Sequence, residues 1–201
     1  MPGYAKDYER FYAADRAEWR AWLAENHDIA KGVWLIYYKK ESGKPRVSYE
    51  ESVEEALCFG WIDSVVNKID EESYMQVFSP RKASSGWSRT NKVRVERLLA
   101  AGLMESAGLK SIEIAKENGT WESLDEVENL TVPDDLQEAL VQHPPALENF
   151  TAFSRSAKKL ILVWIYSAKR PETRMKRVLE TAQLAAQNIK AQQSTSKDKR
   201  E

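Results

Sequence analysis

The chain has 201 residues, of which 42% are hydrophobic and 30% are charged, and its formal net charge is -1. The apolar share is sufficient for a folded core, which excludes a wholly disordered chain. Basic residues number 30 and acidic residues 31, so the chain lacks the overall basic excess of a protein that coats nucleic acid.

The first two helices are marked by capping patterns. Asp15 is followed three residues later by Glu18, which predicts the start of an amphipathic helix over residues 15–26. Ser48 and Glu51 form a clearer capping box, and apolar residues at helical spacing follow them. We therefore expect a second helix that begins near Ser48.

Three segments in the same part of the chain are predicted to be strands. Residues 33–40 are apolar on both faces, which is typical of a central strand covered on both sides. Gly60 is placed to end the second helix, and residues 61–69 and 74–78 follow as two strands with a short polar link. Strands joined by a short link pair antiparallel, so we expect a small antiparallel sheet of about three strands.

The chain then turns helical. Serines between Pro80 and Val93 offer N-caps for a helix that Gly102 ends. A further helix is expected over residues 105–118, and we expect Trp121 to fold back onto the core.

The composition changes beyond Trp121. Residues 122–135 are acidic, and the sequence His143-Pro144-Pro145 is a break that no helix continues through. Short helices are then predicted over 146–153, 156–169 and 171–190.

These elements predict an α+β fold with a small antiparallel sheet packed by helices, followed by a C-terminal helical region. We expect an α+β core domain over residues 1–125 and the helical region over 126–190. Residues 191–201 are polar and are expected to form a disordered tail.

Several segments of the chain are distinctive when taken together. In the first half they are Ala56-Leu57-Cys58-Phe59-Gly60-Trp61-Ile62-Asp63-Ser64, Phe78-Ser79-Pro80-Arg81-Lys82, Ser85-Gly86-Trp87-Ser88 and Asn91. In the second half they are Phe150, Ser154, Lys158-Lys159, Trp164-Ile165, Ala168-Lys169 and Glu172-Thr173-Arg174. These segments resemble the YdeI/OmpD-associated or bacteriocin-protection family, and the resemblance covers about residues 8–190. It implies a bacterial, cytoplasmic protein linked to tolerance of bacteriocins, antimicrobial peptides or envelope stress, and it brings no catalytic residues.

The compartment is also indicated by the residues themselves. Cys58 is the single cysteine and forms no internal disulfide, which indicates a reducing compartment. Residues 1–10 lack the basic stretch and apolar run of a signal peptide. The longest apolar run, Leu160 to Tyr166, is far shorter than the ~20 residues of a membrane-spanning helix. We therefore expect a cytoplasmic protein with no membrane insertion.

The strongest candidate for a binding surface follows the last predicted strand. Arg81 and Lys82 precede a helix start predicted near Ser85, where free N–H groups favour anions, and the serines there add hydroxyl donors. Gly86 allows close approach to the backbone, and Trp87 offers a stacking surface. The alternative is simple capping, with Trp87 in the core and the cations in solvent.

Trp61 and Asp63 lie two residues apart on a predicted strand, so they point to the same face. Asp63 is expected either to orient Arg81 beside a ligand or to form an internal bond that fixes the sheet. The predicted ligand-binding residues are Trp61, Asp63, Arg81, Lys82, Ser85, Trp87 and Asn91.

Cys58 has two interpretations. A buried cysteine acts as a small hydrophobe, whereas a thiolate activated by a cation such as Arg81 is a nucleophile. His27 and His143 are the candidates for a Cys/His pair, although each lies at a predicted helix end, which favours a surface or capping role. One cysteine and two scattered histidines do not supply a structural zinc site. No phosphate-binding or dinucleotide-binding fingerprint is present, so no cofactor is expected.

The basic stretch from Arg155 to Arg177 is a candidate for contact with nucleic acid. The acidic residues between Glu122 and Glu138 offer internal partners that would neutralise this stretch, so nucleic acid is not the expected partner. The sequence favours a protein that binds a small anionic ligand or a protein partner. An enzyme with Cys58 as nucleophile and a nucleic-acid-binding module built on the C-terminal helices remain as alternatives, and the oligomeric state is not predicted.

Overall fold

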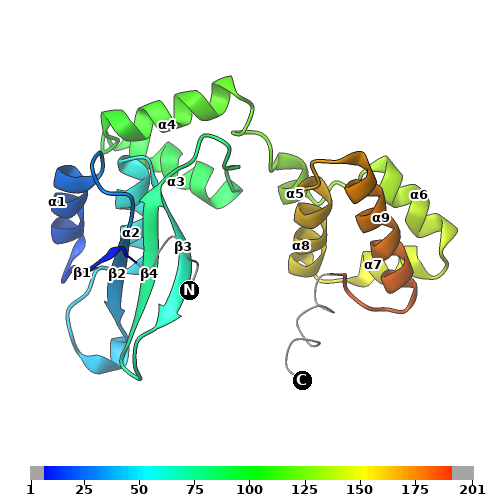
Figure 1. Cartoon of the computed structure of the whole chain (residues 1–201), viewed down its shortest axis with the longest axis horizontal. Coiled ribbons are helices and arrows are strands. Elements are labelled where there is room, and N and C mark those ends of the chain that lie inside the picture. The colour runs from blue at the N-terminus through cyan, green and yellow to red at the C-terminus, as the bar shows by residue number, and fades with distance from the viewer. Residues whose placement is uncertain (1–6, 192–201) are drawn as a thin grey trace. The chain divides into compact units, whose positions relative to one another are not determined.

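The computed structural model describes residues 7–191 (Figure 1). The chain divides into two compact units, Met1–Ser123 and Leu124–Glu201. Apart from Ala191, the expected disordered tail of residues 191–201 lies outside the described range.

The N-terminal unit contains a four-stranded sheet with the order β1-β2-β4-β3 (Figure 1). The strands are β1 (Glu9–Tyr12), β2 (Val33–Tyr38), β3 (Trp61–Lys68) and β4 (Ser73–Pro80). β2, β4 and β3 pair antiparallel, as predicted, whereas β1 pairs parallel with β2. The expected sheet of about three antiparallel strands is therefore incomplete. β1 was not predicted, because four residues at a sheet edge are too few for an alternating pattern to be recognised.

The helices of this unit begin and end close to the predicted residues. They are α1 (Arg16–Asn26), α2 (Tyr49–Cys58), α3 (Arg89–Ala100) and α4 (Ser106–Glu117), with the short 3-10 helix η2 (Lys40–Ser42) after β2. Asp15 caps α1 by accepting the N–H of Glu18 at 2.9 Å, and Ser48 and Glu51 form the complete capping box of α2. These contacts confirm both predicted helix starts, because a capping side chain satisfies N–H groups that have no partner within the helix.

Large aromatic side chains fill the core between the sheet and the helices. Trp19, Trp61, Trp87 and Phe78 are all at most 1% exposed. The indole N–H of Trp19 donates to the Ser52 carbonyl oxygen at 3.0 Å, and that of Trp61 donates to the His27 carbonyl oxygen at 3.0 Å. The polar atoms of these two indoles are therefore satisfied inside the core, so the rings are fixed in place.

Helix α4 packs closely against the end of α2. A Cβ on Gly108 would lie 2.2 Å from the carbonyl oxygen of Cys58, so only glycine fits at this crossing. The N–H of Glu105 donates to the same carbonyl at 3.1 Å. The N–H of Arg81 donates to the Gly60 carbonyl at 2.9 Å, which joins the chain after β4 to the same corner. These contacts bring α2, β4 and α4 together.

Ion pairs tie α1 and α3 to α2. Glu55 is 2% exposed, and its carboxylate accepts hydrogen bonds from Arg16 at 2.5 Å and Arg20 at 2.6 Å. Arg94 of α3 forms an ion pair with Glu50 of α2. A buried carboxylate requires such partners, so this network is a structural feature of the helical layer.

The C-terminal unit is helical over its described residues and confirms the predicted helical region. Its helices are α5 (Asp125–Asn129), α6 (Asp134–Gln142), α7 (Ala146–Ala152), α8 (Arg155–Tyr166) and α9 (Pro171–Ala186). The predicted break after α6 is present, with a cis bond between Pro144 and Pro145. The α+β class is therefore confirmed. No helix among residues 7–191 is long and apolar enough to cross a membrane.

Candidate functional site

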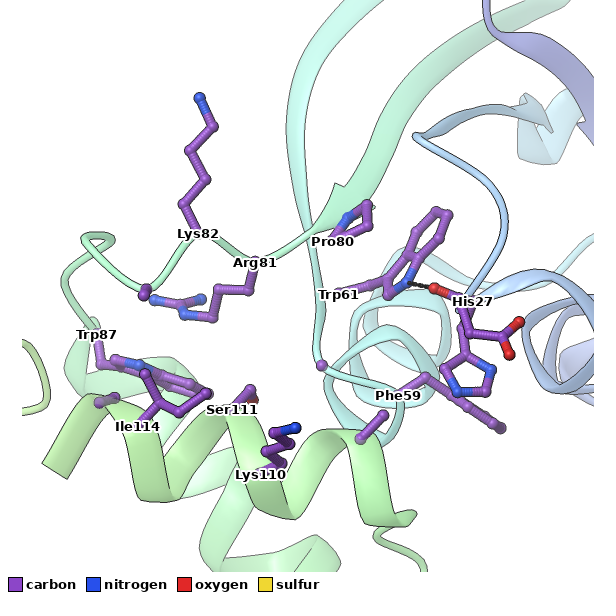
Figure 2. A pocket seen from close by; sticks show the side chains of 15 residues that line it. His27, Phe59, Trp61, Pro80, Arg81, Lys82, Trp87, Lys110, Ser111 and Ile114 are labelled. Atoms are coloured by element: carbon purple, nitrogen blue, oxygen red, sulfur yellow. Dashed lines mark hydrogen bonds between the residues drawn. The ribbon is translucent and has the colours of Figure 1, made fainter. Parts of the chain in front are cut away.

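A pocket of about 310 Å³ lies at the corner where β4 ends (Figure 2). It is lined by the turn after α1, the turn between α2 and β3, the segment that follows β4, and one face of α4. Its lining residues are His27, Asp28, Phe59, Gly60, Trp61, Pro80, Arg81, Lys82, Ala83, Trp87, Ala107, Lys110, Ser111, Ile114 and Ala115. Most of these side chains are apolar, and a few charged ones stand among them, which is the usual composition of a small-molecule site.

Helix α4 forms the floor of the pocket. Ala107, Lys110, Ser111 and Ile114 recur at helical spacing, so they share one face of the helix. From Ala107 to Ala115 the helix rises ~12 Å, which sets the length of the floor. In Figure 2 the labelled residues Lys110, Ser111 and Ile114 lie along this helix beneath the side chains that come from β3 and β4.

Arg81 is the most unusual polar side chain of the pocket. Its guanidinium lies over the indole of Trp87, 3.8 Å from the ring centroid, and Nη2 donates to the carbonyl oxygen of Gly86. Its Nε is buried without a hydrogen-bond partner, and no other buried side-chain nitrogen or oxygen among the described residues lacks one. Burial lowers the pKa of Arg81 to about 10, against the opposing effect of the Asp63 charge, so the side chain carries its charge at neutral pH.

Two lysines add positive charge to the same pocket. Lys82 and Lys110 are both exposed, and within the described part of the chain neither ammonium group forms an ion pair. Asp28 is the single acidic residue of the lining. The pocket therefore holds a net positive charge in a largely apolar surround, where an anion is attracted more strongly than on an open surface.

Four of the seven predicted ligand-binding residues line this pocket: Trp61, Arg81, Lys82 and Trp87. Asp63 does not. Its carboxylate accepts hydrogen bonds from the Tyr49 hydroxyl at 3.1 Å and the Gln76 amide at 2.7 Å. No hydrogen bond joins Asp63 to Arg81 in the described structure, so Asp63 acts on Arg81 through its charge alone.

Ser85 and Asn91 also lie outside the pocket lining. The N–H of Ser85 donates to the Lys82 carbonyl at 2.9 Å within a turn. Helix α3 begins at Arg89, not near Ser85, and Ser88 caps it by accepting the Asn91 N–H at 3.3 Å. The side chain of Asn91 accepts from Arg94 at 2.8 Å. The start of α3 is thus engaged in capping, which is the alternative to ligand binding that the sequence left open.

The N-terminus of α4 does not supply the positive potential either. Its first turn packs against the C-terminal end of α2, where the backbone N–H of Glu105 donates to the carbonyl oxygen of Cys58. The partial positive charge of one helix end is thereby opposed by the partial negative charge of the other. The attraction for an anion comes from the side chains of Arg81, Lys82 and Lys110.

Cys58 is buried and lies at the end of α2. Burial, and then the nearby Glu55 charge, raise the pKa of its thiol to about 11, although Arg20 acts in the opposite direction. The thiol is therefore protonated at neutral pH, which removes the nucleophilic form. The cation beside Cys58 is Arg20, not Arg81.

Both histidines lie at helix C-termini. His27 caps α1, and its Nδ1 lies 3.0 Å from the Leu23 carbonyl oxygen. His143 caps α6, with Nδ1 2.8 Å from the Ala139 carbonyl oxygen. Within residues 7–191 no group of three or more His, Cys, Asp or Glu side chains is placed to hold a metal ion.

Most of the basic residues of α8 and α9 have partners inside the C-terminal unit. Lys159 forms an ion pair with Glu128 at 2.7 Å, and Arg174 forms one with Asp135 at 2.7 Å. Arg155 donates to the carbonyl oxygen of Glu128 at 2.6 Å. In the two ion pairs, acidic residues from the segment before α6 and from α6 neutralise basic residues of α8 and α9. Less free positive charge is therefore left to bind nucleic acid.

Sequence reasoning missed the part of the pocket that comes from elsewhere in the chain. Asp28 and Lys110 line it but belong to no motif, and the sequence singled out His27 and Phe59 for other reasons, not as pocket residues. Lys110 lies within a correctly predicted helix, yet nothing local distinguishes it from Lys116 on the same helix. Only packing shows which lysine faces the pocket.

Comparison with known proteins gives two matches. A domain of unknown function (DUF8412) matches residues 11–111, and the family described as Bacteriocin-protection, YdeI or OmpD-Associated matches residues 129–188. No curated protein and no solved structure matches the chain. The resemblance noted from the sequence to the second family is thus found over the C-terminal unit, whereas its segments between residues 56 and 91 fall within the first match. The chain belongs to the family of the DUF8412 domain, and its residues 129–188 are similar to the family described as Bacteriocin-protection, YdeI or OmpD-Associated.

Proposed function

We propose that the N-terminal unit binds a small anionic ligand in the pocket between the end of β4 and α4. The observation that carries this proposal is the buried, unpartnered Nε of Arg81 at the edge of a pocket of about 310 Å³. Buried polar groups normally have a partner, and an exception at a pocket wall is accounted for when a ligand supplies the missing acceptor. A carboxylate or phosphate oxygen is the acceptor that a guanidinium prefers.

The surroundings of Arg81 support an anion at this position. Trp87 holds the guanidinium plane and limits its freedom, so little conformational entropy is lost when a ligand binds. Lys82 and Lys110 add charge, and the apolar wall excludes water from the interaction. The binding would serve protection against bacteriocins, which the description of the family matched by residues 129–188 names.

Binding, and not catalysis, is the activity that this pocket favours. Its lining contains no cysteine, and the one thiol of the chain is buried with a raised pKa. A nucleophile with a neighbouring base is the minimal arrangement for covalent catalysis, and Cys58 lies beside Glu55 and Arg20 instead. Recognition of a ligand needs only the charges and the apolar wall that the pocket has.

The test is a calorimetric titration of the full chain with inorganic phosphate, sulfate, acetate and octanoate at low ionic strength. We expect at least one of these anions to bind, with an affinity that falls as salt rises. Arg81→Met should weaken that binding at least about tenfold, since it removes a charge-assisted pair in a partly buried site. Lys176→Met removes a charge from an exposed lysine of α9 outside the pocket and should change nothing.

Absence of binding by all four anions would contradict the proposal. Equal binding by the wild type and Arg81→Met would also contradict it, because the anion would then be held elsewhere.

A further inference from the structure

We infer that the natural ligand of this pocket is bipolar, with an anionic group at Arg81, a protonated amine at Asp28 and an apolar segment between them. This inference rests on the proposed function and specifies the ligand class for the same site. It follows from the order of the residues along α4 and from the charges at the two ends of the pocket.

One end of the floor lies beside His27 and Asp28. A Cβ on Gly60 would come within 2.9 Å of the Ala107 carbonyl oxygen, so the turn between α2 and β3 rests on the first turn of α4. The ring of Phe59 lies 5.1 Å from that of His27, and Asp28 is the next residue along the chain. Asp28 therefore belongs to the Ala107 end of the pocket.

The other end of the floor lies beside Arg81. The backbone N–H of Trp121 donates to the Ala115 carbonyl oxygen at 3.0 Å, and the centroid of the Trp121 ring lies 4.9 Å from that of the Trp87 ring. Arg81 lies over the same Trp87. In Figure 2, His27 and Phe59 accordingly lie on one side of the pocket, and Lys82 and Trp87 lie on the other. The two charged ends are separated by a floor that is ~12 Å long.

The charges of the two ends have opposite signs. Asp28 is exposed, and no hydrogen bond or ion pair occupies its carboxylate in the part of the chain that the structure describes. The C-terminus of α1 ends at the same place and adds partial negative charge. Arg20 lies over Phe59 nearby, but its guanidinium is engaged by Glu55 and Glu105. A cation is thus favoured at this end, and Lys110 is the one pocket cation between the ends that competes for Asp28.

Apolar side chains line the pocket around Lys110. Pro80 is exposed and Ile114 is half-buried, so both offer apolar surface to a ligand, whereas Trp61 is 1% exposed and already packed. A compact inorganic anion would leave this surface unfilled, whereas an aliphatic or aromatic segment would bury it. A second negative charge carried to the far end would be repelled by Asp28.

The test compares three probes that share one chain length: octanoate, 8-aminooctanoate and octanedioate. Their affinities for the full chain are measured by calorimetry, together with the shifts of the Trp61 and Trp87 indole N–H signals in nitrogen-15 spectra. We expect 8-aminooctanoate to bind about two- to fivefold more tightly than octanoate, the gain of one solvent-exposed ion pair. Octanedioate should bind more weakly than octanoate, because its second carboxylate meets Asp28.

Asp28→Asn should abolish both differences while octanoate binding is retained. Glu25→Gln removes an equivalent charge from an exposed position on α1 outside the pocket, and it should leave both differences unchanged. Equal affinities of octanoate and 8-aminooctanoate for the wild type, or a preference that survives in Asp28→Asn, would overturn the inference. In either case binding of octanoate or an inorganic anion that depends on Arg81 would leave the proposed function standing, whereas absence of binding by these probes and by phosphate, sulfate and acetate would overturn both.

Discussion

The guanidinium of Arg81 lies 3.8 Å from the centroid of the Trp87 indole ring, while its Nε is buried without a partner. A cation over an indole face is attracted by the ring, by about 0.5 to 2 kcal/mol according to its burial. An unsatisfied buried donor costs about 1 to 3 kcal/mol. The two contributions oppose each other, so Arg81 adds little to stability by itself, and the proposed ligand would supply the missing acceptor.

The first prediction concerns the stability of Arg81→Met. Methionine keeps apolar contact with Trp87 and removes both the unpartnered donor and the desolvated charge, so we expect the free energy of unfolding to change by less than about 1 kcal/mol. Arg94→Met is the comparison, because Arg94 is 8% exposed and is bonded to Glu50 and Asn91. It should destabilise by about 1 to 3 kcal/mol. Urea unfolding followed by tryptophan fluorescence measures both, and a loss above about 2 kcal/mol in Arg81→Met would make Arg81 a structural residue.

The second prediction concerns the thiol of Cys58. Its pKa is raised to about 11, mainly by burial, so we expect labelling by a disulfide reagent at pH 8 to be roughly two orders of magnitude slower in the native protein than in urea. The reagent's chromophore gives the rate and the stoichiometry directly. Rapid stoichiometric labelling of the native chain would instead restore the alternative of an enzyme with Cys58 as nucleophile.

The third prediction concerns the crossing of α2 and α4. Gly108→Ala would place a Cβ 2.2 Å from the Cys58 carbonyl oxygen, so α4 must shift, at an expected cost of about 1 to 3 kcal/mol or more. The pocket floor shifts with it, so anion affinity should fall as well. Gly119→Ala is the control, because its Cβ would meet nothing within 4 Å and only the positive φ of 74° opposes it. Its cost should stay near 1 kcal/mol, with binding unchanged.

The fourth prediction concerns pH and the C-terminal unit. Arg174 lowers the pKa of Asp135 through a two-point contact at 2.7 and 3.0 Å. A carboxylate with a lowered folded-state pKa stabilises the fold above its unfolded pKa, near 4, and this contribution is lost as pH falls through the folded pKa. Asp135→Asn should therefore reduce the stability at pH 7 by about 0.5 to 1 kcal/mol, since the pair is partly exposed.

The difference between Asp135→Asn and the wild type should shrink below pH 4 and vanish once Asp135 is protonated in both states. Trp164 is the single tryptophan beyond residue 123, so its indole N–H signal in nitrogen-15 spectra reports the unfolding of this unit. Glu148→Gln, which removes an exposed carboxylate of α7, should show no such pH-dependent difference. A difference that persists at low pH would show that Asp135 contributes through its shape and not through its charge.

Local interactions explain which parts of the fold the sequence predicted. Some features depend only on residues within four positions of one another, so they can be recognised in the sequence. They are the caps at Asp15 and Ser48 and the turn at Gly60. The start of α3 was misplaced because several nearby serines are equal candidates, and only the bond from Asn91 to Ser88 selects one. β1 was missed because its four residues are too few to show an alternating pattern, and its parallel pairing with β2 is decided only by the tertiary structure.

The same distinction applies to the pocket. The sequence by itself determined an α+β chain with a C-terminal helical region, and it drew attention to Arg81, Lys82, Trp61 and Trp87 because they flank the ends of two strands. Only the tertiary structure decided that Asp63, Ser85 and Asn91 are engaged in other hydrogen bonds, and that His27, Asp28 and Lys110 line the same pocket as Arg81. Residues so far apart in the chain meet because burial of the aromatic core brings α1 and α4 to the corner where β4 ends, and packing of that kind has no local signature in the sequence.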